Sequence, residues 1–262
     1  MKITPSHIQK MKGREKIPAI TAYDYTSAKL VDAAGLPLIL VGDSLGMTVL
    51  GHPTTLPVTL DNMLHHTAAV VRGVENALVV ADMPFLTYQV NDDEAVRNAG
   101  RFLQETGADA VKLEGGAERA PLIRRLVQNG IPVMGHIGLT PQSVKSLGYA
   151  VQGRGAAGAK LRDDAQALSD AGVFSLVLEA CPAALAADIT AAIPVPTIGI
   201  GAGAACDGQI LVMHDMLGLF TDFTPKFVKR YANLGEDMRQ AFQTYAGEVR
   251  TGHFPGPEHQ YD

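Results

Sequence analysis

Ionisable side chains end a series of short hydrophobic runs in this 262-residue chain. The residues at these positions are Asp43, Asp82, the pair Lys112 and Glu114, His136, and Glu179. Taken singly, each has an ordinary structural role available: Asp43 or Asp82 could cap a turn, and His136 could be a core histidine. Such placement at five runs in succession is harder to explain in that way, because a buried carboxylate without a partner costs several kcal/mol. The set therefore indicates a functional site.

The chemistry that these residues favour is binding of a hard cation. If the runs are neighbouring strands, about 4.8 Å apart, Asp43, Asp82 and Glu114 can reach one shared point. An all-oxygen set without cysteine or histidine suits magnesium or manganese better than zinc.

Lys112 is expected to share that site. It stands two residues before Glu114, so both side chains leave a strand on the same face. Neighbouring carboxylates raise the pKa of a lysine, which favours a charged group that holds an anion over a Schiff-base nucleophile.

The elements that must position these groups are parallel strands joined by helices. Apolar periods at helical spacing lie between the runs: one follows Thr59 as an N-cap, and others end before Gly107 and Gly130. Eight strands are predicted, at 17–23, 37–43, 77–82, 110–114, 132–136, 174–179, 195–200 and 209–214. The strand number and the length, close to the ~250 residues of a (βα)₈ TIM barrel, favour a closed barrel over an open doubly wound sheet. We expect one domain over residues 1–262, with a C-terminal helix over 224–249 closing the barrel.

Composition excludes several classes of function. With 47% hydrophobic residues, 19% charged residues and a net charge of -5, the chain lacks the basic footprint of a nucleic-acid or anionic-membrane partner. No apolar stretch opens the sequence or reaches the ~20 residues of a membrane span, so we expect a cytoplasmic protein that acts on small molecules. Cys181 and Cys206 form no CxxC pair and are expected to be reduced and structural.

Three further segments admit more than one interpretation. The connection from Gly138 to Lys160 is long, and it could be an active-site lid, a surface insertion or an oligomer contact. The glycine-rich run Gly199 to Gly203 could cradle a phosphate, but a tight strand-to-loop turn is favoured. His65 and His66 lie on a predicted helix and are expected at the surface or an interface.

The motifs around these positions resemble those of the ketopantoate hydroxymethyltransferase family. The matching stretches, in chain order, are Thr21–Tyr25, Val41–Met47, Ala81–Phe85, Val111–Gly116, Gly135–Gln142, Val177–Pro182 and Gly199–Leu211. The resemblance covers almost the whole chain and departs most at Gly153 to Lys160.

This resemblance implies transfer of a hydroxymethyl group from 5,10-methylenetetrahydrofolate to 3-methyl-2-oxobutanoate, giving 2-dehydropantoate for pantothenate biosynthesis. It implies a barrel of the phosphoenolpyruvate/pyruvate type that binds Mg²⁺ and assembles as a homo-oligomer, a decamer. By motif, Asp43, Asp82 and Glu114 take the metal positions, and Glu179 takes that of the catalytic base. The positions that bind the oxo acid fall on Asp43, Ser44, Asp82, Lys112 and His136.

Two other functions remain open at this stage. A magnesium-dependent 2-oxo acid aldolase or lyase of a related barrel family would share the oxo-acid site, and an assay with methylenetetrahydrofolate against simple aldehydes would separate the two enzymes. A non-catalytic binding or assembly protein could retain the barrel, but intact carboxylates at the strand ends argue against it.

Overall fold

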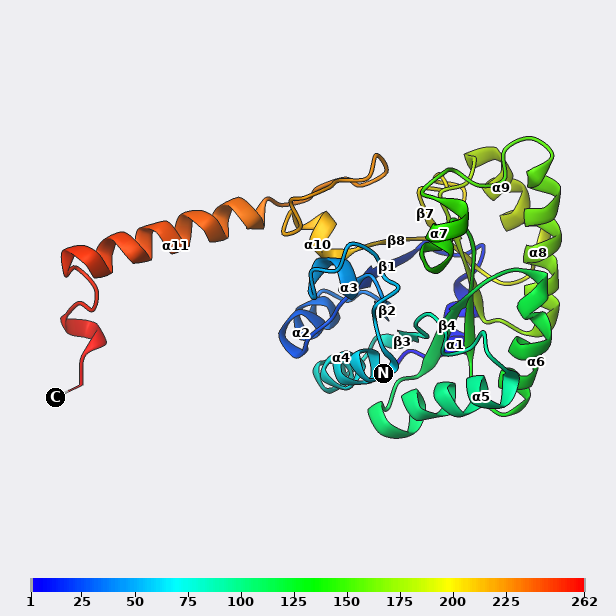
Figure 1. Ribbon diagram of the computed structural model, residues 1–262, viewed down its shortest axis with the longest axis horizontal. Coiled ribbons are helices and arrows are strands. Elements are labelled where there is room, and N and C mark those ends of the chain that lie inside the picture. Colours follow the sequence, from blue (N-terminus) through cyan, green and yellow to red (C-terminus); the bar gives the residue numbers. More distant parts are fainter. Residues whose placement is uncertain (1, 262) are drawn as a thin grey trace. The chain divides into compact units, whose positions relative to one another are not determined.

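Eight parallel strands form a closed barrel in the computed structural model, which describes residues 2–261 (Figure 1). The strands are β1 (Ile17–Thr21), β2 (Leu38–Val41), β3 (Leu78–Asp82), β4 (Ala110–Glu114), β5 (Val133–Gly138), β6 (Ser175–Glu179), β7 (Thr197–Ile200) and β8 (Gly208–Leu211). Each pairs with the next in parallel, and β1 also pairs with β8. The predicted (βα)₈ barrel is confirmed, and every predicted strand overlaps an observed one.

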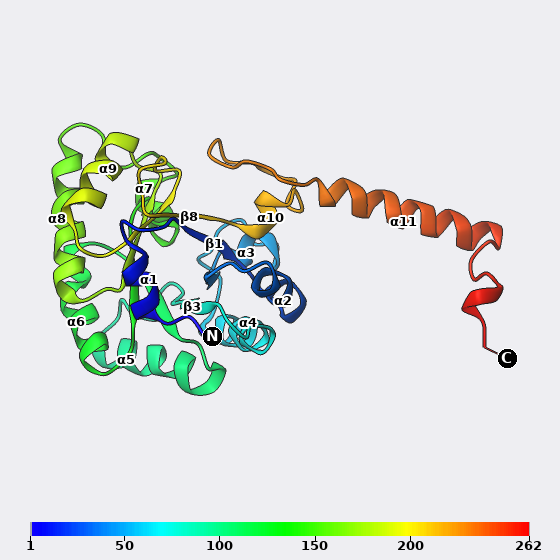
Figure 2. The same ribbon diagram turned by 180° about the vertical axis from the view of Figure 1, so that it is seen from behind.

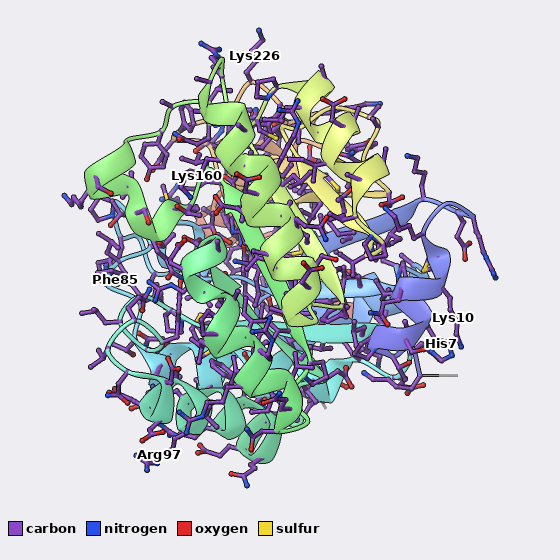
Figure 3. All side chains as sticks on the ribbon, turned by 90° about the vertical axis from the view of Figure 1, so that its right-hand side faces the viewer. His7, Lys10, Phe85, Arg97, Lys160 and Lys226 are labelled. Carbon is purple, nitrogen blue, oxygen red and sulfur yellow. The ribbon has the colours of Figure 1, made fainter. Side chains whose placement is uncertain are left out.

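Helices alternate with the strands and cover the outside of the barrel (Figures 1 and 2). They are α1 (Pro5–Met11), α2 (Tyr25–Ala33), α3 (Leu45–Thr48), α4 (Leu60–Gly73), α5 (Asp92–Arg101), α6 (Ala120–Gln128), α7 (Val144–Leu147), α8 (Ala157–Ala171) and α9 (Ala183–Ala192). Two further helices, α10 (Met213–Met216) and α11 (Leu234–Thr251), follow the last strand. Short 3₁₀ turns lie at Ala117–Arg119, Pro141–Ser143 and Pro257–His259, and a π-helical turn at Phe102–Thr106 extends α5. From the side in Figure 3, α6 and α8 lie in front of the strands, with Lys160 on the first turns of α8.

Helix α4 shows why these segments become helical. Thr59 accepts a hydrogen bond from the backbone N–H of Asn62, and the Asn62 side chain accepts one from the Thr59 backbone, which satisfies two free N–H groups of the first turn. The helix then buries Met63 and Val70 against the strands. The predicted N-cap is confirmed. Helix α5 and its π-helical extension end as predicted at Gly107, which has a φ of 77°.

The hydrophobic core has two layers, one inside the barrel and one between strands and helices. Leu38 and Leu40 of β2 belong to the inner layer, whereas Ile39 and Val41 belong to the outer layer. The same alternation places Leu78 and Val80 of β3 inside. Because strand side chains alternate between faces, the next inward position of β3 is Asp82. In β4 the same alternation places Lys112 and Glu114 on the inward face that Ala110 occupies.

The segments between elements correct parts of the sequence prediction. The connection from Gly138 to Lys160 is not one open loop: it holds a 3₁₀ turn, α7 and the first turn of α8. Its role as a lid stays a prediction. Gly201 and Gly203, with φ values of 64° and 85°, form the tight turn after β7 that the glycine pattern indicated.

Compact packing divides the chain at Val212, into Met1–Val212, which holds all eight strands, and Met213–Asp262. The expectation of one domain over residues 1–262 stays a prediction. In the second unit the C-terminal helix begins at Leu234, not at Thr224 as predicted. The backbone N–H groups of Tyr231 and Leu234 bond to the carbonyls of Met216 and Leu217, which places the preceding segment against the turn after α10. Barrel closure itself comes from β1 and β8.

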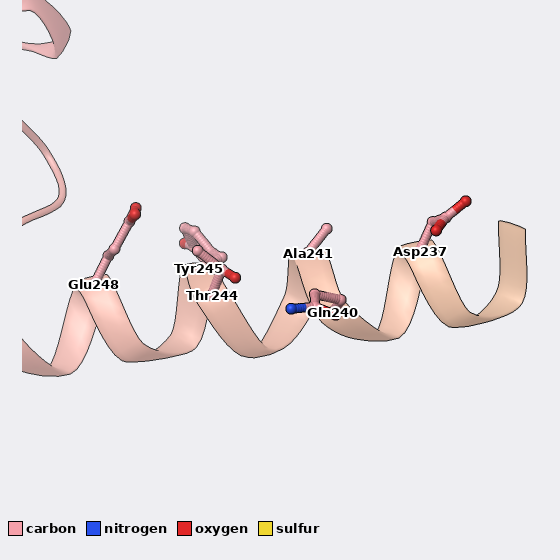
Figure 4. Close-up of a pocket in the computed structure, with 6 residues that line it drawn as sticks. All are labelled: Asp237, Gln240, Ala241, Thr244, Tyr245 and Glu248. Atoms are coloured by element: carbon pink, nitrogen blue, oxygen red, sulfur yellow. The ribbon is translucent and has the colours of Figure 1, made fainter.

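Helix α11 has no buried residue. A hollow of about 560 Å³ lies along it, lined by six residues of this helix alone: Asp237, Gln240, Ala241, Thr244, Tyr245 and Glu248 (Figure 4). Because it holds none of the strand-end residues, it is not where the predicted chemistry lies. Within residues 2–261 we find no helix of the length and apolarity needed to cross a bilayer.

Candidate active site

The inward rows of β3 to β6 end in polar residues that face one another across the barrel mouth. Asp82 lies opposite Lys112 in the strand register, and Glu114 lies opposite His136. Each of these side chains is buried, as is Asp43, which follows β2. Glu179 ends β6 and pairs in register with Gly138. The structure therefore brings together the ionisable residues that the sequence singled out.

Three carboxylates gather on one side of this mouth. The backbone N–H of Asp43 donates to Oδ2 of Asp82 at 3.2 Å. Burial raises the pKa of Asp43 well above its ordinary value, and the nearby charges of Asp82 and Glu114 raise it further. Burial likewise raises the pKa of Asp82, although Lys112 opposes the shift. Ionisation of Asp43 and Asp82 together is therefore unfavourable unless a further cation compensates their charge.

Lys112 is the cation at the centre of this group, with its Nζ 2.7 Å from Oδ1 of Asp82. Burial alone would lower the pKa of Lys112, but the charges of Asp82, Glu114 and Asp43 outweigh burial and raise it. The lysine stays protonated at neutral pH, in agreement with its predicted role as an anion-holding group and against a Schiff-base role.

His136 connects the carboxylates to Glu179. Its Nε2 lies 3.1 Å from Oε2 of Glu179, and its Nδ1 lies 3.6 Å from Oε1 of Glu114. Burial and the charge of Lys112 lower the pKa of His136, but hydrogen bonds to the two glutamates dominate and raise it to about 9. The two glutamates thus favour the imidazolium form of His136, against the opposing charge of Lys112, whose Nζ lies 3.4 Å from Nδ1.

Ser44 lies at the edge of the site, beside Asp43 in sequence. Its hydroxyl is half-buried and lies 2.8 Å from Oη of Tyr23, the residue two positions after β1. His66, predicted at the surface or an interface, is half-buried, and its Nδ1 lies 2.7 Å from the backbone oxygen of Tyr23. Helix α4 thus supports the segment that contacts Ser44.

Two site residues escaped the sequence prediction, Tyr88 and Gln142. Both are buried, and their side chains are hydrogen-bonded to each other. The Gln142 side chain also donates to the Asp43 carboxylate, and the Tyr88 hydroxyl accepts the backbone N–H of Glu114. Neither titrates at neutral pH, and neither stands at the end of a strand, so the search for charged strand ends passed over them. Gln142 did lie in the motif Gly135–Gln142, directly after Thr140 and Pro141. An amide side chain a few residues beyond a predicted strand end was therefore the sequence signal that could have revealed Gln142.

The carboxylate group suits a hard cation in its chemistry. Its donors are oxygens, and of the three carboxylates Asp82 alone, among residues 2–261, lies within 4.0 Å of a lysine or arginine nitrogen. This excess of buried negative charge fits a divalent ion. In the described part of the chain, however, no three His, Cys, Asp or Glu side chains stand arranged to hold a metal. Asp43, Asp82 and Glu114 as metal ligands stay a prediction.

The two cysteines take no part in this site. Cys181 and Cys206 are both buried and free. Burial raises the pKa of Cys181 to about 11 and raises that of Cys206, which disfavours the thiolate. The prediction of reduced, structural cysteines agrees with this environment.

Solved structures of other enzymes share the fold of this chain. Phosphonopyruvate hydrolase matches with a TM-score of 0.65 at 13% identity, covering 98% of this chain and 90% of that one. A 2,3-dimethylmalate lyase, a member of the PEP mutase/isocitrate lyase superfamily, matches with a TM-score of 0.61 at 16% identity, covering 100% of this chain and 93% of that one. At such identities the likeness concerns the fold alone. The chain therefore shares the barrel fold of these enzymes.

Sequence relatives identify the family of this chain. The family model for ketopantoate hydroxymethyltransferase matches residues 2–257. Proteins named 3-methyl-2-oxobutanoate hydroxymethyltransferase from Chloroflexus aurantiacus and Moorella thermoacetica are each 60% identical to this chain over 99% of its length, covering 92% and 98% of their own. The chain belongs to the ketopantoate hydroxymethyltransferase family. It is a transferase of pantothenate biosynthesis, as the motifs predicted.

Proposed function

We propose that the strand-end residues described above carry out hydroxymethyl transfer from 5,10-methylenetetrahydrofolate to 3-methyl-2-oxobutanoate, with Mg²⁺ held by Asp43, Asp82 and Glu114. The observation that supports this most directly is the convergence of three buried carboxylates and Lys112 on one side of a barrel mouth, with Glu179 on β6. When bound, Mg²⁺ would supply Lewis-acid stabilisation of negative charge on the 2-oxo group, worth several kcal/mol.

The positive groups of the site bind and orient the oxo acid. Lys112, protonated among carboxylates, offers its charge to the substrate's anionic end. The Ser44 hydroxyl offers a hydrogen bond to a substrate oxygen. His136, whose two ring nitrogens face Glu114 and Glu179, adds positive charge to the mouth. Asp43 and Asp82 take part in the same binding through the site they share with the metal.

Glu179 is the proposed base. It ends β6, four strands from β2 in the closed eight-strand order, so it faces Asp43 across the mouth. Its carboxylate removes the proton from C3 of the oxo acid, and the resulting carbanion equivalent forms a C–C bond with the one-carbon unit. The bonds from that carbon to the folate nitrogens break with uptake of one water, which supplies the hydroxyl group and releases tetrahydrofolate. A positioned base contributes about 10²- to 10⁴-fold in rate. His136, 3.1 Å from Oε2, fixes the direction of the carboxylate.

Proton exchange at C3 tests this assignment without the folate substrate. In deuterated water with Mg²⁺, the wild-type enzyme should replace the C3 hydrogen of 3-methyl-2-oxobutanoate by deuterium. Proton NMR measures this exchange as the loss of the C3 proton signal. Glu179→Gln should bind the oxo acid and lose exchange. Exchange at the wild-type rate in Glu179→Gln would show that Glu179 is not the base.

The one-carbon donor separates a transferase from an aldolase. A transferase should form 2-dehydropantoate with methylenetetrahydrofolate but not with simple aldehydes.

We further infer a homo-oligomer, a decamer by family resemblance, that works on small molecules in the cytoplasm. The support lies in α11, where Met238, Phe242, Tyr245 and Val249 recur at spacings of three and four residues and are all exposed. A helix with one apolar face is stabilised by burying that face against a partner. Analytical ultracentrifugation should give a mass near ten chains, and Phe242→Glu should reduce it. A monomeric wild-type protein would overturn this inference.

A further inference from the structure

Gln142 connects two of the three carboxylates proposed to hold the metal. It lies in the 3₁₀ turn Pro141–Ser143, which begins three residues after the end of β5, and its side chain is buried. Its Nε2 donates to Oδ2 of Asp43 at 2.9 Å, and its backbone N–H donates to Oε2 of Glu114 at 3.1 Å. One residue thus contacts a carboxylate that follows β2 and another that ends β4.

Tyr88 fixes the direction of the Gln142 amide. The phenol oxygen of Tyr88 accepts the backbone N–H of Glu114 at 3.2 Å, and its single proton is donated to Oε1 of Gln142 at 2.6 Å. On its other side the amide meets the backbone carbonyl of Met83 at 2.9 Å, which can only accept. The amide oxygen therefore faces Tyr88, and the NH₂ group faces Met83 and Asp43.

This orientation matters for Asp43, because the NH₂ group of Gln142 donates to Oδ2 and thereby fixes the orientation of the Asp43 carboxylate. The same side chain and backbone turn set the positions of the Asp43 and Glu114 carboxylates relative to each other. Groups that orient metal-binding carboxylates through hydrogen bonds commonly change metal affinity by about 10- to 100-fold when removed.

We propose that Gln142, oriented by Tyr88, is a positioning residue that directs the carboxylates of Asp43 and Glu114, two of the proposed ligands of a divalent cation. The inference rests on the proposed function, since it takes Asp43 and Glu114 as metal ligands. Gln142 acts through these carboxylates and is not itself a catalytic residue.

Titration calorimetry with Mg²⁺, in the presence of 3-methyl-2-oxobutanoate, tests the proposal on the full-length protein. Gln142→Leu keeps the volume and the backbone hydrogen bond to Glu114 but removes the side-chain hydrogen bonds to Asp43, Met83 and Tyr88. It should weaken Mg²⁺ binding by about 10- to 100-fold. Tyr88→Phe, which removes one hydroxyl, should weaken it in the same direction and by less. Gln166→Leu is the matched control, because Gln166 is an exposed glutamine of α8.

The metal dependence of C3 exchange gives a second readout, which separates positioning from a general loss of folded protein. In Gln142→Leu the Mg²⁺ concentration for half-maximal exchange should rise while the rate at saturating Mg²⁺ stays near that of the wild type. A purely structural defect would lower the maximal rate and leave the half-saturation point in place. If Gln142→Leu does not fold, Tyr88→Phe carries the same comparison.

The outcomes separate this proposal from the metal site itself. If wild-type protein binds Mg²⁺, Asp43→Asn abolishes binding, and both Gln142→Leu and Tyr88→Phe titrate like the wild type, the positioning role is wrong and the metal site stands. If the wild type shows no Mg²⁺ binding, the metal site is wrong and the positioning role is overturned with it.

Discussion

His136 Nε2 lies 3.1 Å from Oε2 of Glu179, so the proposed base is paired with a cation. Glu179 ends β6, which lies four strands from β2 in the barrel. The other nitrogen of the ring reaches toward Glu114 at 3.6 Å. One imidazolium therefore links the two sides of the barrel mouth.

The first prediction follows from that contact. Replacing His136 by Gln should lower the rate of C3 exchange by about 10- to 100-fold, because Glu179 loses the partner that directs its carboxylate. Proton NMR in deuterated water at saturating Mg²⁺ gives the rate. His65→Gln, an exposed histidine of α4, serves as the control. Equal rates for His136→Gln and the wild type would show that the contact has no part in proton removal.

The second prediction concerns the buried ion pair. Lys112→Met should lower the free energy of unfolding by about 3–5 kcal/mol, because it leaves Asp82 buried beside two other carboxylates without its cation. Denaturant unfolding without metal measures the change. Lys226→Met, on an exposed lysine, should be nearly neutral. A loss for Lys112→Met as small as that for the control would contradict the electrostatic account of the site.

The third prediction tests backbone packing beside Glu179. Gly138 has a φ of 99°, and a Cβ built on it would lie 2.2 Å from the backbone oxygen of Glu179. Gly138→Ala should therefore both destabilise the protein and reduce C3 exchange. Gly130→Ala is the matched control, since its φ of 79° is strained but a Cβ there meets no atom within 4 Å. Only the first variant should lose activity, and similar activity in both would show that β5 adjusts freely.

The fourth prediction concerns the pH dependence of the C-terminal unit. Burial raises the pKa of Asp215 to about 6, although Arg230 opposes the shift. The folded state therefore favours the protonated form, and this group's contribution to stability falls as the pH rises from about 4 through 6. Asp215→Asn should raise the melting temperature relative to wild type at pH 7.5 and change it little at pH 4. The reverse pattern would contradict the burial of this carboxyl.

The barrel and its ionisable groups were accessible from the sequence because both follow short-range rules. Hydrophobic runs at regular spacing predict strands, and a charge at the end of a run predicts a group at the mouth. The structure places three such groups, Asp82, Lys112 and Glu114, buried at the ends of β3 and β4, as this rule predicts. The start of α11 at Leu234 depends instead on backbone hydrogen bonds with residues 216 and 217, which no local pattern encodes.

Tyr88 and Gln142 mark the other limit of the sequence prediction. Their 2.6 Å hydrogen bond joins the segment after β3 to the turn after β5. Such a contact depends on how two loops fold over the mouth, and neutral side chains leave no charge pattern to reveal it. The ionisable groups of the site could thus be predicted, whereas the neutral groups that orient them required the structure.

The alternation of the two core layers also limits how this site can change. Inserting one residue into the middle of β4 would turn Lys112 and Glu114 together toward the helices and bring apolar neighbours to the mouth. A strand that bears two functional groups on one face therefore tolerates substitution at single positions but not a change in length. Variation in length within this family should accordingly be confined to the connections between strands, whereas the strands that carry the site keep a constant number of residues.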